Sequence, residues 1–187
     1  TGEITGKIEF PCTSPGYFDH PITDKEGNFW QTALVKETES LLKINVNDTS
    51  IETITTFPLV SSEYEDQMDY YTVQKVTDDK IFLSRTPLGI GSENEAVVIV
   101  DKNNVNNVQT INMPNTKIDT DFFIYKIIEV DGEFYTVSPG ADFIKKVMFA
   151  KIDRENNELR PLDVVLENID MTETVYVRGT RVYLMSS

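Results

Sequence analysis

The sequence predicts an all-β fold of antiparallel four-stranded meanders that repeat about every 50 residues. An aromatic residue marks the middle of one predicted strand in each repeat, and successive marks are 52, 53 and 48 residues apart: Trp30, Phe82, Tyr135 and Tyr183. A polar turn follows the first three marks after 17, 19 and 18 residues, beginning at Asn47, Asp101 and Asp153. Two landmarks that recur in phase favour a β-propeller or a related array of stacked sheets. We expect the four aromatic residues to be largely buried at equivalent positions of the repeat.

The composition agrees with this fold class. Eight Tyr and ten Phe accompany abundant Val, Ile and Thr, which are the residues that pleated strands favour. A chain of 187 residues is long enough to bury a sizeable core. We therefore predict a single propeller-like domain over residues 1–187.

Alternating apolar residues and turn signals place the strands in order. Residues 1–10 form a short strand, with Ile4, Ile8 and Phe10 at alternate positions, and residues 11–21 form a proline-rich loop. Four units follow at about residues 17–58, 70–112, 122–166 and 172–187. Their predicted strands are residues 28–36, 41–46 and 51–57; 70–76, 80–85, 96–100 and 107–112; 122–130, 133–138, 147–152 and 159–166; and 172–177 and 181–185.

Turn chemistry supports the unit boundaries. The pairs Asp78-Asp79, Asp131-Gly132 and Arg178-Gly179 lie between the first two strands of successive units. Asp and Gly tolerate the tight geometry of a hairpin turn. The continuous apolar run at residues 96–100 indicates a strand that is covered on both faces, as an inner strand of stacked sheets would be.

The last unit has only two predicted strands, so the chain shows about three and a half units. A single blade cannot bury its own faces, and stacking is what would stabilise the set. Residues 1–10 are one source of an outer strand, which would close a small four-bladed ring by pairing the two ends of the chain. The alternative is that the chain is a fragment of a larger propeller.

Residues 23–46 resemble the blades of two-component regulator propellers and of virginiamycin B lyase-like propellers. The resemblance is carried by Asp24, the pair Gly27-Asn28, Trp30 and the strand at residues 41–46. It implies that Gly27 and Asn28 shape a hairpin and that Trp30 packs between blades. Later units keep only the aromatic residue and the turn, so the resemblance implies a propeller fold without a specific activity.

The net charge of −14 argues against nucleic acid and anionic lipid as partners, since both require Lys and Arg for neutralisation. No apolar run approaches the roughly 18 to 20 residues of a membrane-spanning helix. Catalytic groups are sparse, because His20 and Cys12 are the only residues of their types. The stretches at residues 101–105 and 153–157 supply oxygens but lack the glycine of a calcium loop, and we read them as hairpin turns. We predict no catalytic residues, no metal and no cofactor.

One segment is a candidate ligand site. Four acids and two tyrosines cluster in the link between the first two full units: Glu63, Tyr64, Glu65, Asp66, Asp69 and Tyr70. Links between blades lie at one face of a propeller, where carboxylates can converge. Acids beside aromatic rings suit a cationic or sugar ligand through charge, cation–π contact or stacking. The alternative is a solvated link whose acids serve solubility.

These observations favour a non-catalytic recognition or sensing module. We expect an extracytoplasmic or secreted part of a bacterial surface or signalling protein, while a cytoplasmic location also fits the sequence. Its partner would be a small molecule, a carbohydrate or a protein. Two alternatives remain: a propeller enzyme of the lyase or metal-dependent lactonase type, with Glu63, Asp66 or Asp69 as metal ligands, and a structural domain for protein–protein interaction.

Overall fold

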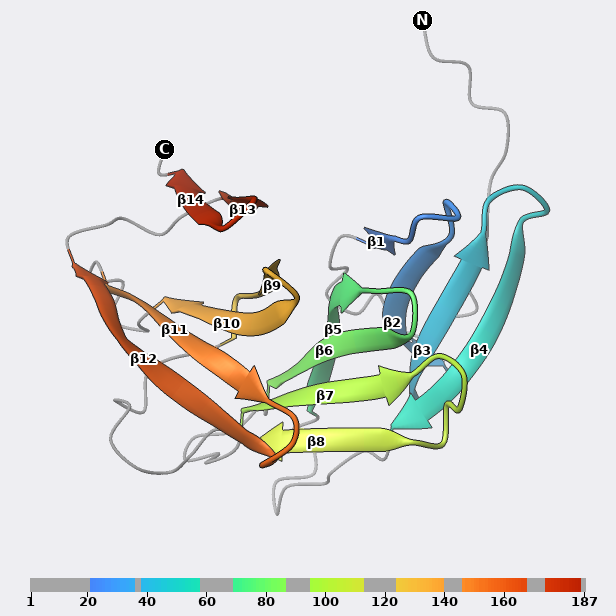
Figure 1. Ribbon diagram of the computed structural model, residues 1–187. Coiled ribbons are helices and arrows are strands. Elements are labelled where there is room, and N and C mark those ends of the chain that lie inside the picture. Colours follow the sequence, from blue (N-terminus) through green and yellow to red (C-terminus); the bar gives the residue numbers. More distant parts are fainter. Residues whose placement is uncertain are drawn as a thin grey trace, which may run out of the picture.

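The computed structural model describes residues 21–35, 38–57, 69–86, 95–112, 124–139, 146–167 and 174–185. Within these ranges all regular secondary structure is β-strand (Figure 1). The all-β prediction is therefore confirmed for the described part of the chain. Residues 1–10, which we predict as a strand, lie outside it.

The strands form three four-stranded antiparallel sheets and one two-stranded hairpin, each with its strands in chain order. Sheet I consists of β1 (Ile22–Thr23), β2 (Phe29–Val35), β3 (Thr38–Asn45) and β4 (Ser50–Phe57). Sheet II consists of β5 (Tyr70–Val76), β6 (Lys80–Thr86), β7 (Ala96–Asp101) and β8 (Val108–Asn112). Sheet III consists of β9 (Lys126–Val130), β10 (Glu133–Pro139), β11 (Lys146–Asp153) and β12 (Glu158–Glu167). Hairpin IV consists of β13 (Thr174–Arg178) and β14 (Arg181–Met185).

This arrangement confirms the predicted four-stranded meanders at residues 70–112 and 122–166. The short strand β1 completes sheet I and was not predicted from the sequence. The sheets follow one another along an open arc, and the described residues do not close into a ring (Figure 1).

Neighbouring sheets pack face to face through apolar clusters. Between sheets I and II, side chains of β2, β3 and β4 meet those of β5, β6 and β7: Trp30, Leu41 and Phe57 with Tyr71, Val73, Ile81, Leu83, Val98 and Val100. Between sheets II and III the cluster contains Phe82, Val97, Ile99 and Ile111 with Ile124, Ile127, Phe134, Ala150, Ile152 and Leu159. Sheet II is therefore apolar on both faces, which explains why all five residues from Ala96 to Val100 are buried.

The aromatic marks of the repeat point toward the following sheet. Trp30 is 3% exposed and Phe82 is fully buried, where its ring stacks on Phe134 with 4.3 Å between ring centroids. Tyr135 is half-buried. The prediction that Tyr183 is buried is wrong, because its side chain is 38% exposed. Its face of hairpin IV meets no further sheet among the described residues, and its ring stacks on that of Tyr176.

The turn before β2 is organised by one carboxylate. Asp24 Oδ1 accepts hydrogen bonds from the backbone N–H of Glu26 at 3.0 Å and of Asn28 at 2.8 Å. Its other oxygen, Oδ2, accepts from the indole Nε1 of Trp30 at 2.8 Å. Gly27 has φ of +86°, a backbone conformation that favours glycine. The Asp, Gly, Asn and Trp of this segment thus act as one structural unit, which fixes the start of β2.

The third strands of the sheets end in equivalent turns. Asp101 Oδ1 accepts from the backbone N–H of Asn103 at 2.8 Å, and Asp153 Oδ1 accepts from that of Asn156 at 3.0 Å. The remaining oxygen of Asp101 pairs with Lys80 Nζ at 2.7 Å. These side chains are therefore engaged by their own turns, in agreement with the interpretation of both segments as hairpin turns.

Candidate functional site

Of the six predicted site residues, the structure describes Asp69 and Tyr70, at the start of β5. Glu63, Tyr64, Glu65 and Asp66 lie outside the described residues. The carboxylate of Asp69 is only 12% exposed, and its Oδ2 lies 3.7 Å from Nε of Arg85. Burial raises the pKa of Asp69, and the neighbouring Arg85 guanidinium opposes that rise. Asp69 therefore faces a neighbouring strand of its own sheet, and its use in ligand binding stays a prediction.

Asp69 belongs to a polar cluster centred on Tyr71, which joins sheets I and II. The Tyr71 ring stacks on Phe57, with 4.3 Å between centroids and 8° between planes. The Thr32 hydroxyl donates to the backbone carbonyl of Tyr71. Glu39 is 8% exposed beside Thr32, and its burial raises its pKa to about 7, against the opposing effect of the Thr32 hydrogen bond. We use the name Tyr71 cluster for the following residues: Thr32, Glu39, Phe57, Asp69, Tyr71 and Arg85.

Sheet II carries a second, half-buried acid at the matching position. Glu39 opposes Leu34 near the start of β3, and Glu95 directly precedes Ala96 at the start of β7. Glu95 Oε2 accepts a hydrogen bond from the backbone N–H of Ile124 at 2.7 Å. Burial raises the pKa of Glu95 to about 7, although the bond from Ile124 opposes the rise. Both acids thus lie between neighbouring sheets, near the ends from which the links between sheets leave.

The Tyr71 cluster and Glu95 are bound mainly to partners in the adjoining strands and sheets. Such groups fix the relative position of sheets I, II and III. Sequence reasoning missed Glu39 and Glu95, because one Glu at a strand start is usually solvated. An alignment of the units by their strands could have found them, because it places both acids at the same position of the third strand.

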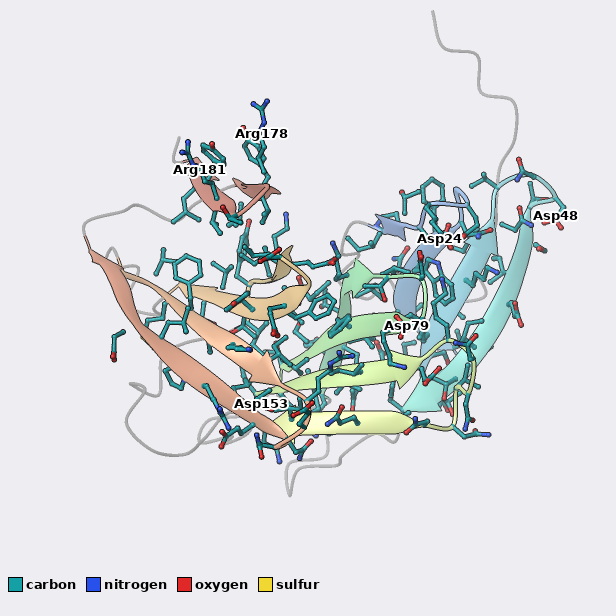
Figure 2. All side chains as sticks on the ribbon, viewed as in Figure 1. Asp24, Asp48, Asp79, Asp153, Arg178 and Arg181 are labelled. Atoms are coloured by element: carbon teal, nitrogen blue, oxygen red, sulfur yellow. The ribbon has the colours of Figure 1, made fainter. Side chains whose placement is uncertain are left out.

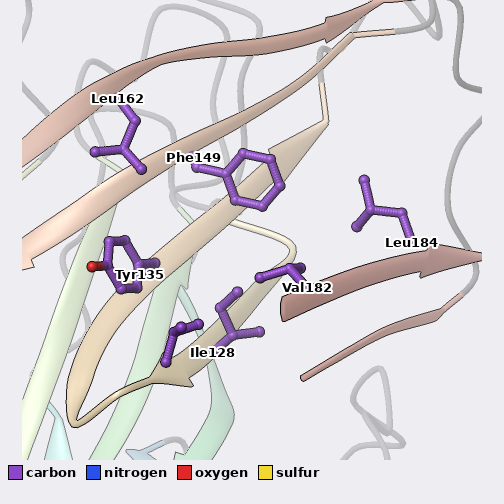
Figure 3. Close-up of a pocket in the computed structure, with 7 residues that line it drawn as sticks. Ile128, Tyr135, Phe149, Leu162, Val182 and Leu184 are labelled. Carbon is purple, nitrogen blue, oxygen red and sulfur yellow. The ribbon is translucent and has the colours of Figure 1, made fainter. Parts of the chain in front are cut away.

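The second candidate is an apolar groove between sheet III and hairpin IV, with a volume of about 350 Å³. Seven residues line it: Ile128, Val130, Tyr135, Phe149, Leu162, Val182 and Leu184. Figure 3 shows Tyr135, Phe149 and Leu162 on the sheet III side, with Leu184 facing them from β14. Leu162 is 38% exposed, so solvent reaches this end of the groove.

The groove exists because hairpin IV is narrower than the sheet beneath it. Val175 of β13 is 1% exposed and packs with Val137 and Val147 of sheet III. The outer strands β11 and β12 extend past the hairpin, and there Phe149 and Leu162 contribute to the lining. Sequence reasoning did not identify these residues as a site.

Within the described ranges, no three His, Cys, Asp or Glu side chains are placed to hold a metal ion together. No helix in the same ranges is long and apolar enough to cross a membrane. Comparisons of the chain with protein-family models, curated proteins and solved structures found no match. A functional assignment therefore rests on the geometry of the described residues.

Proposed function

We propose that this protein is a non-catalytic recognition module that binds a polypeptide partner in the groove between sheet III and hairpin IV. The observation that carries the proposal is the groove itself, with a volume of about 350 Å³ and a lining of aliphatic and aromatic side chains. Concave apolar sites of this size are typical binding sites, and exposed apolar surface in such a site favours association.

The chemistry of the lining favours apolar side chains as the ligand. The Tyr135 hydroxyl is the one side-chain polar group among the seven lining residues. A carbohydrate requires several hydrogen-bonding groups, and a cationic ligand requires a carboxylate or an open aromatic face. Apolar side chains of a protein require neither. Of the partners expected from the sequence, we therefore propose a protein rather than a carbohydrate or a cationic small molecule. We also propose the groove as the binding site in place of the acidic link.

The stacked sheets suit this role as a scaffold. Three sheets joined by continuous apolar clusters hold β10, β11 and β12 in fixed positions, so the groove is largely formed before a ligand binds. We propose that these sheets are blades of a propeller-like array, because each packs face to face on the next in chain order. The localisation expected from the sequence, outside the cytoplasm, is compatible with such a module and remains part of the proposal.

A fluorescent probe that binds apolar surface tests the proposal. Leu184 lines the groove, whereas the adjacent Tyr183 points to the opposite face of β14. We expect the native protein to bind anilinonaphthalene sulfonate, Leu184→Asp to weaken that binding at least about tenfold, and the matched control Tyr183→Asp to leave it nearly unchanged. Trp30 fluorescence reports whether each variant is folded, because Trp30 lies in the distant cluster between sheets I and II. Equal effects of the two substitutions would exclude the groove as the binding site.

A further inference from the structure

The junction between sheets II and III is fixed at two points. In its middle the ring of Phe82 stacks on that of Phe134, which brings β6 against β10. At the end from which the links leave, the carboxylate of Glu95 accepts the hydrogen bond from the Ile124 backbone N–H at 2.7 Å. The side chains that lie between these two contacts therefore face one another across the junction.

Polar side chains fill this stretch of the junction. On β6, Ser84 and Thr86 follow the stacked ring at alternate positions, so they share its face. On β10, Thr136 and Ser138 follow the other stacked ring in the same way. The register agrees, because Thr136 pairs with Ala150, which belongs to the apolar cluster between these sheets. Hydroxyl groups from both sheets thus point into one part of the junction.

Two of these hydroxyl groups are buried without a hydrogen-bond partner. Thr136 is 0% exposed and Ser138 is 3% exposed, and the hydroxyl oxygen of each is unpaired. Ser84, by contrast, accepts a hydrogen bond from a glutamine amide of β5 at 3.1 Å. Buried polar groups in folded proteins are almost always satisfied, and an orphaned one marks a position where water or an ion binds.

The carboxyl group beside these hydroxyls has no cation as a partner. Burial raises the pKa of Glu95, and the groups that oppose the rise are the Ile124 backbone N–H and the Thr86 side chain, with no basic residue among them. Arg85 of β6 lies on the opposite face, which packs on sheet I. Tyr70, the cross-strand partner of Thr86, brings a phenol and no positive charge. An ionised carboxylate between the sheets therefore lacks a counter-charge.

The other basic residues of these strands are placed elsewhere. Lys75 of β5 pairs with Glu129 of β9 at 3.2 Å. Lys126 lies on the face of β9 that is turned toward hairpin IV, because the next residue belongs to the cluster between sheets II and III. Figure 2 shows Arg178 and Arg181 on hairpin IV, apart from this junction.

We propose that the junction binds a monovalent alkali cation, sodium or potassium, through the Glu95 carboxylate and the hydroxyl oxygens of Thr136 and Ser138. Carboxylate and hydroxyl oxygens are ligands that hard cations prefer, and the two hydroxyls have lone pairs that no other group uses. One carboxylate balances one positive charge, whereas a divalent ion would leave an uncompensated charge between the sheets. The cation would join sheets II and III, and this inference does not depend on the function of the groove.

The equivalent acid of sheet I provides a matched control. Glu39 also faces the next sheet, but the Thr32 hydroxyl beside it donates to the backbone carbonyl of Tyr71. The Arg85 guanidinium lies in the same cluster. Among the described residues of this junction no buried hydroxyl is left unpartnered. We therefore expect no cation at Glu39.

The melting temperature measured by calorimetry tests the proposal. The chain is compared at pH 8 in chloride salts of one fixed concentration, with sodium, potassium or tetramethylammonium as the cation. Tetramethylammonium presents only methyl groups, so it does not bind to oxygen ligands. At about ten times its dissociation constant, the preferred alkali cation should raise the melting temperature by roughly 3 to 6 °C relative to tetramethylammonium. The difference should vanish at pH 5, because a proton then replaces the cation at Glu95.

Three variants locate the effect. Glu95→Gln should lose the response to the alkali cation, and Glu39→Gln should keep it. Thr136→Val removes one hydroxyl at nearly constant shape, so it should at least halve the response without lowering the melting temperature in tetramethylammonium. This variant also carries the test if Glu95→Gln does not fold.

Two results would overturn the inference. Equal melting temperatures of the native chain in the three chlorides at pH 8 would mean that water alone satisfies the two hydroxyls. A response that Glu95→Gln retains, or that Glu39→Gln loses, would place the cation elsewhere. General screening of the net charge of −14 does not mimic the effect, because all three salts have the same ionic strength.

Discussion

Replacing Glu39 with Gln should remove a measurable part of the pH dependence of stability. Burial raises the pKa of Glu39 to about 7 in the folded chain, from an ordinary value of 4.5. Since one pKa unit corresponds to about 1.4 kcal/mol, the folded state disfavours the ionised carboxylate by roughly 3 kcal/mol. Solvent screening reduces this figure little, because the side chain is 8% exposed.

The local hydrogen bonding opposes part of this effect. The hydrogen bond with the Thr32 side chain lowers the pKa of Glu39, but the larger effect of burial raises it. A Gln amide at position 39 has nearly the shape of the carboxyl and carries no charge, so Glu39→Gln should remove the cost of burying the charge and keep a hydrogen-bonding group there.

The sign of the effect follows from proton binding. Between about pH 4.5 and 7 the folded chain keeps the Glu39 proton and the unfolded chain has released it, so stability falls as pH rises through this window. Glu95, whose pKa burial also raises to about 7, contributes in the same direction. Glu39→Gln should leave stability near pH 4.5 almost unchanged, raise it by up to about 3 kcal/mol at pH 8, and roughly halve the dependence on pH.

Urea denaturation followed by Trp30 fluorescence at pH 4.5, 6 and 8 measures this difference. Glu52→Gln is the matched control, because Glu52 is exposed on β4. Every other titratable group is common to both proteins, so the difference between the variant and the native chain isolates Glu39. An unchanged pH dependence in Glu39→Gln, or an equal loss of stability at every pH, would refute the reasoning.

Four further substitutions test the fold. Phe82→Ala should lower the free energy of unfolding by about 3 to 5 kcal/mol, because the side chain is fully buried between sheets II and III. Tyr183→Ala, on the exposed face of β14, should change the free energy of unfolding by less than about 1 kcal/mol. Similar losses in the two variants would contradict the assigned faces. Asp24→Ala removes the acceptor of the Trp30 and Asn28 hydrogen bonds and should cost about 2 kcal/mol in urea denaturation, and a neutral result would mean that the turn forms without it. Gly132→Ala should lower the melting temperature by an amount equivalent to about 1 kcal/mol, because φ is +77° there; a rise in melting temperature would show that the turn has another conformation.

Much of the fold could be predicted from the sequence, because each strand pattern is local. The predicted strands at residues 70–76 and 181–185 coincide with β5 and β14. Asp131 and Gly132 both have positive φ, as a tight hairpin turn requires. The exposure of Tyr183 could not be predicted in this way, because it depends on whether another sheet covers that face of β14.

The candidate sites were harder to predict for the same reason. The burial of Glu39 and the partial burial of Glu95 result from the stacking of neighbouring sheets, which no local pattern records. The groove brings together β9 and β14, whose residues are separated by more than 50 positions in the chain. Alternation predicts which residues of a strand share a face, and it does not predict which face is left uncovered.

Magnetisation transfer between the bound fluorescent probe and the groove tests the central claim most directly. With an isotope-labelled chain and unlabelled anilinonaphthalene sulfonate, we predict cross-peaks from the aromatic protons of the probe to Leu184 and to the Phe149 ring. Cross-peaks from the same protons to Tyr183, on the opposite face of β14, would contradict the account.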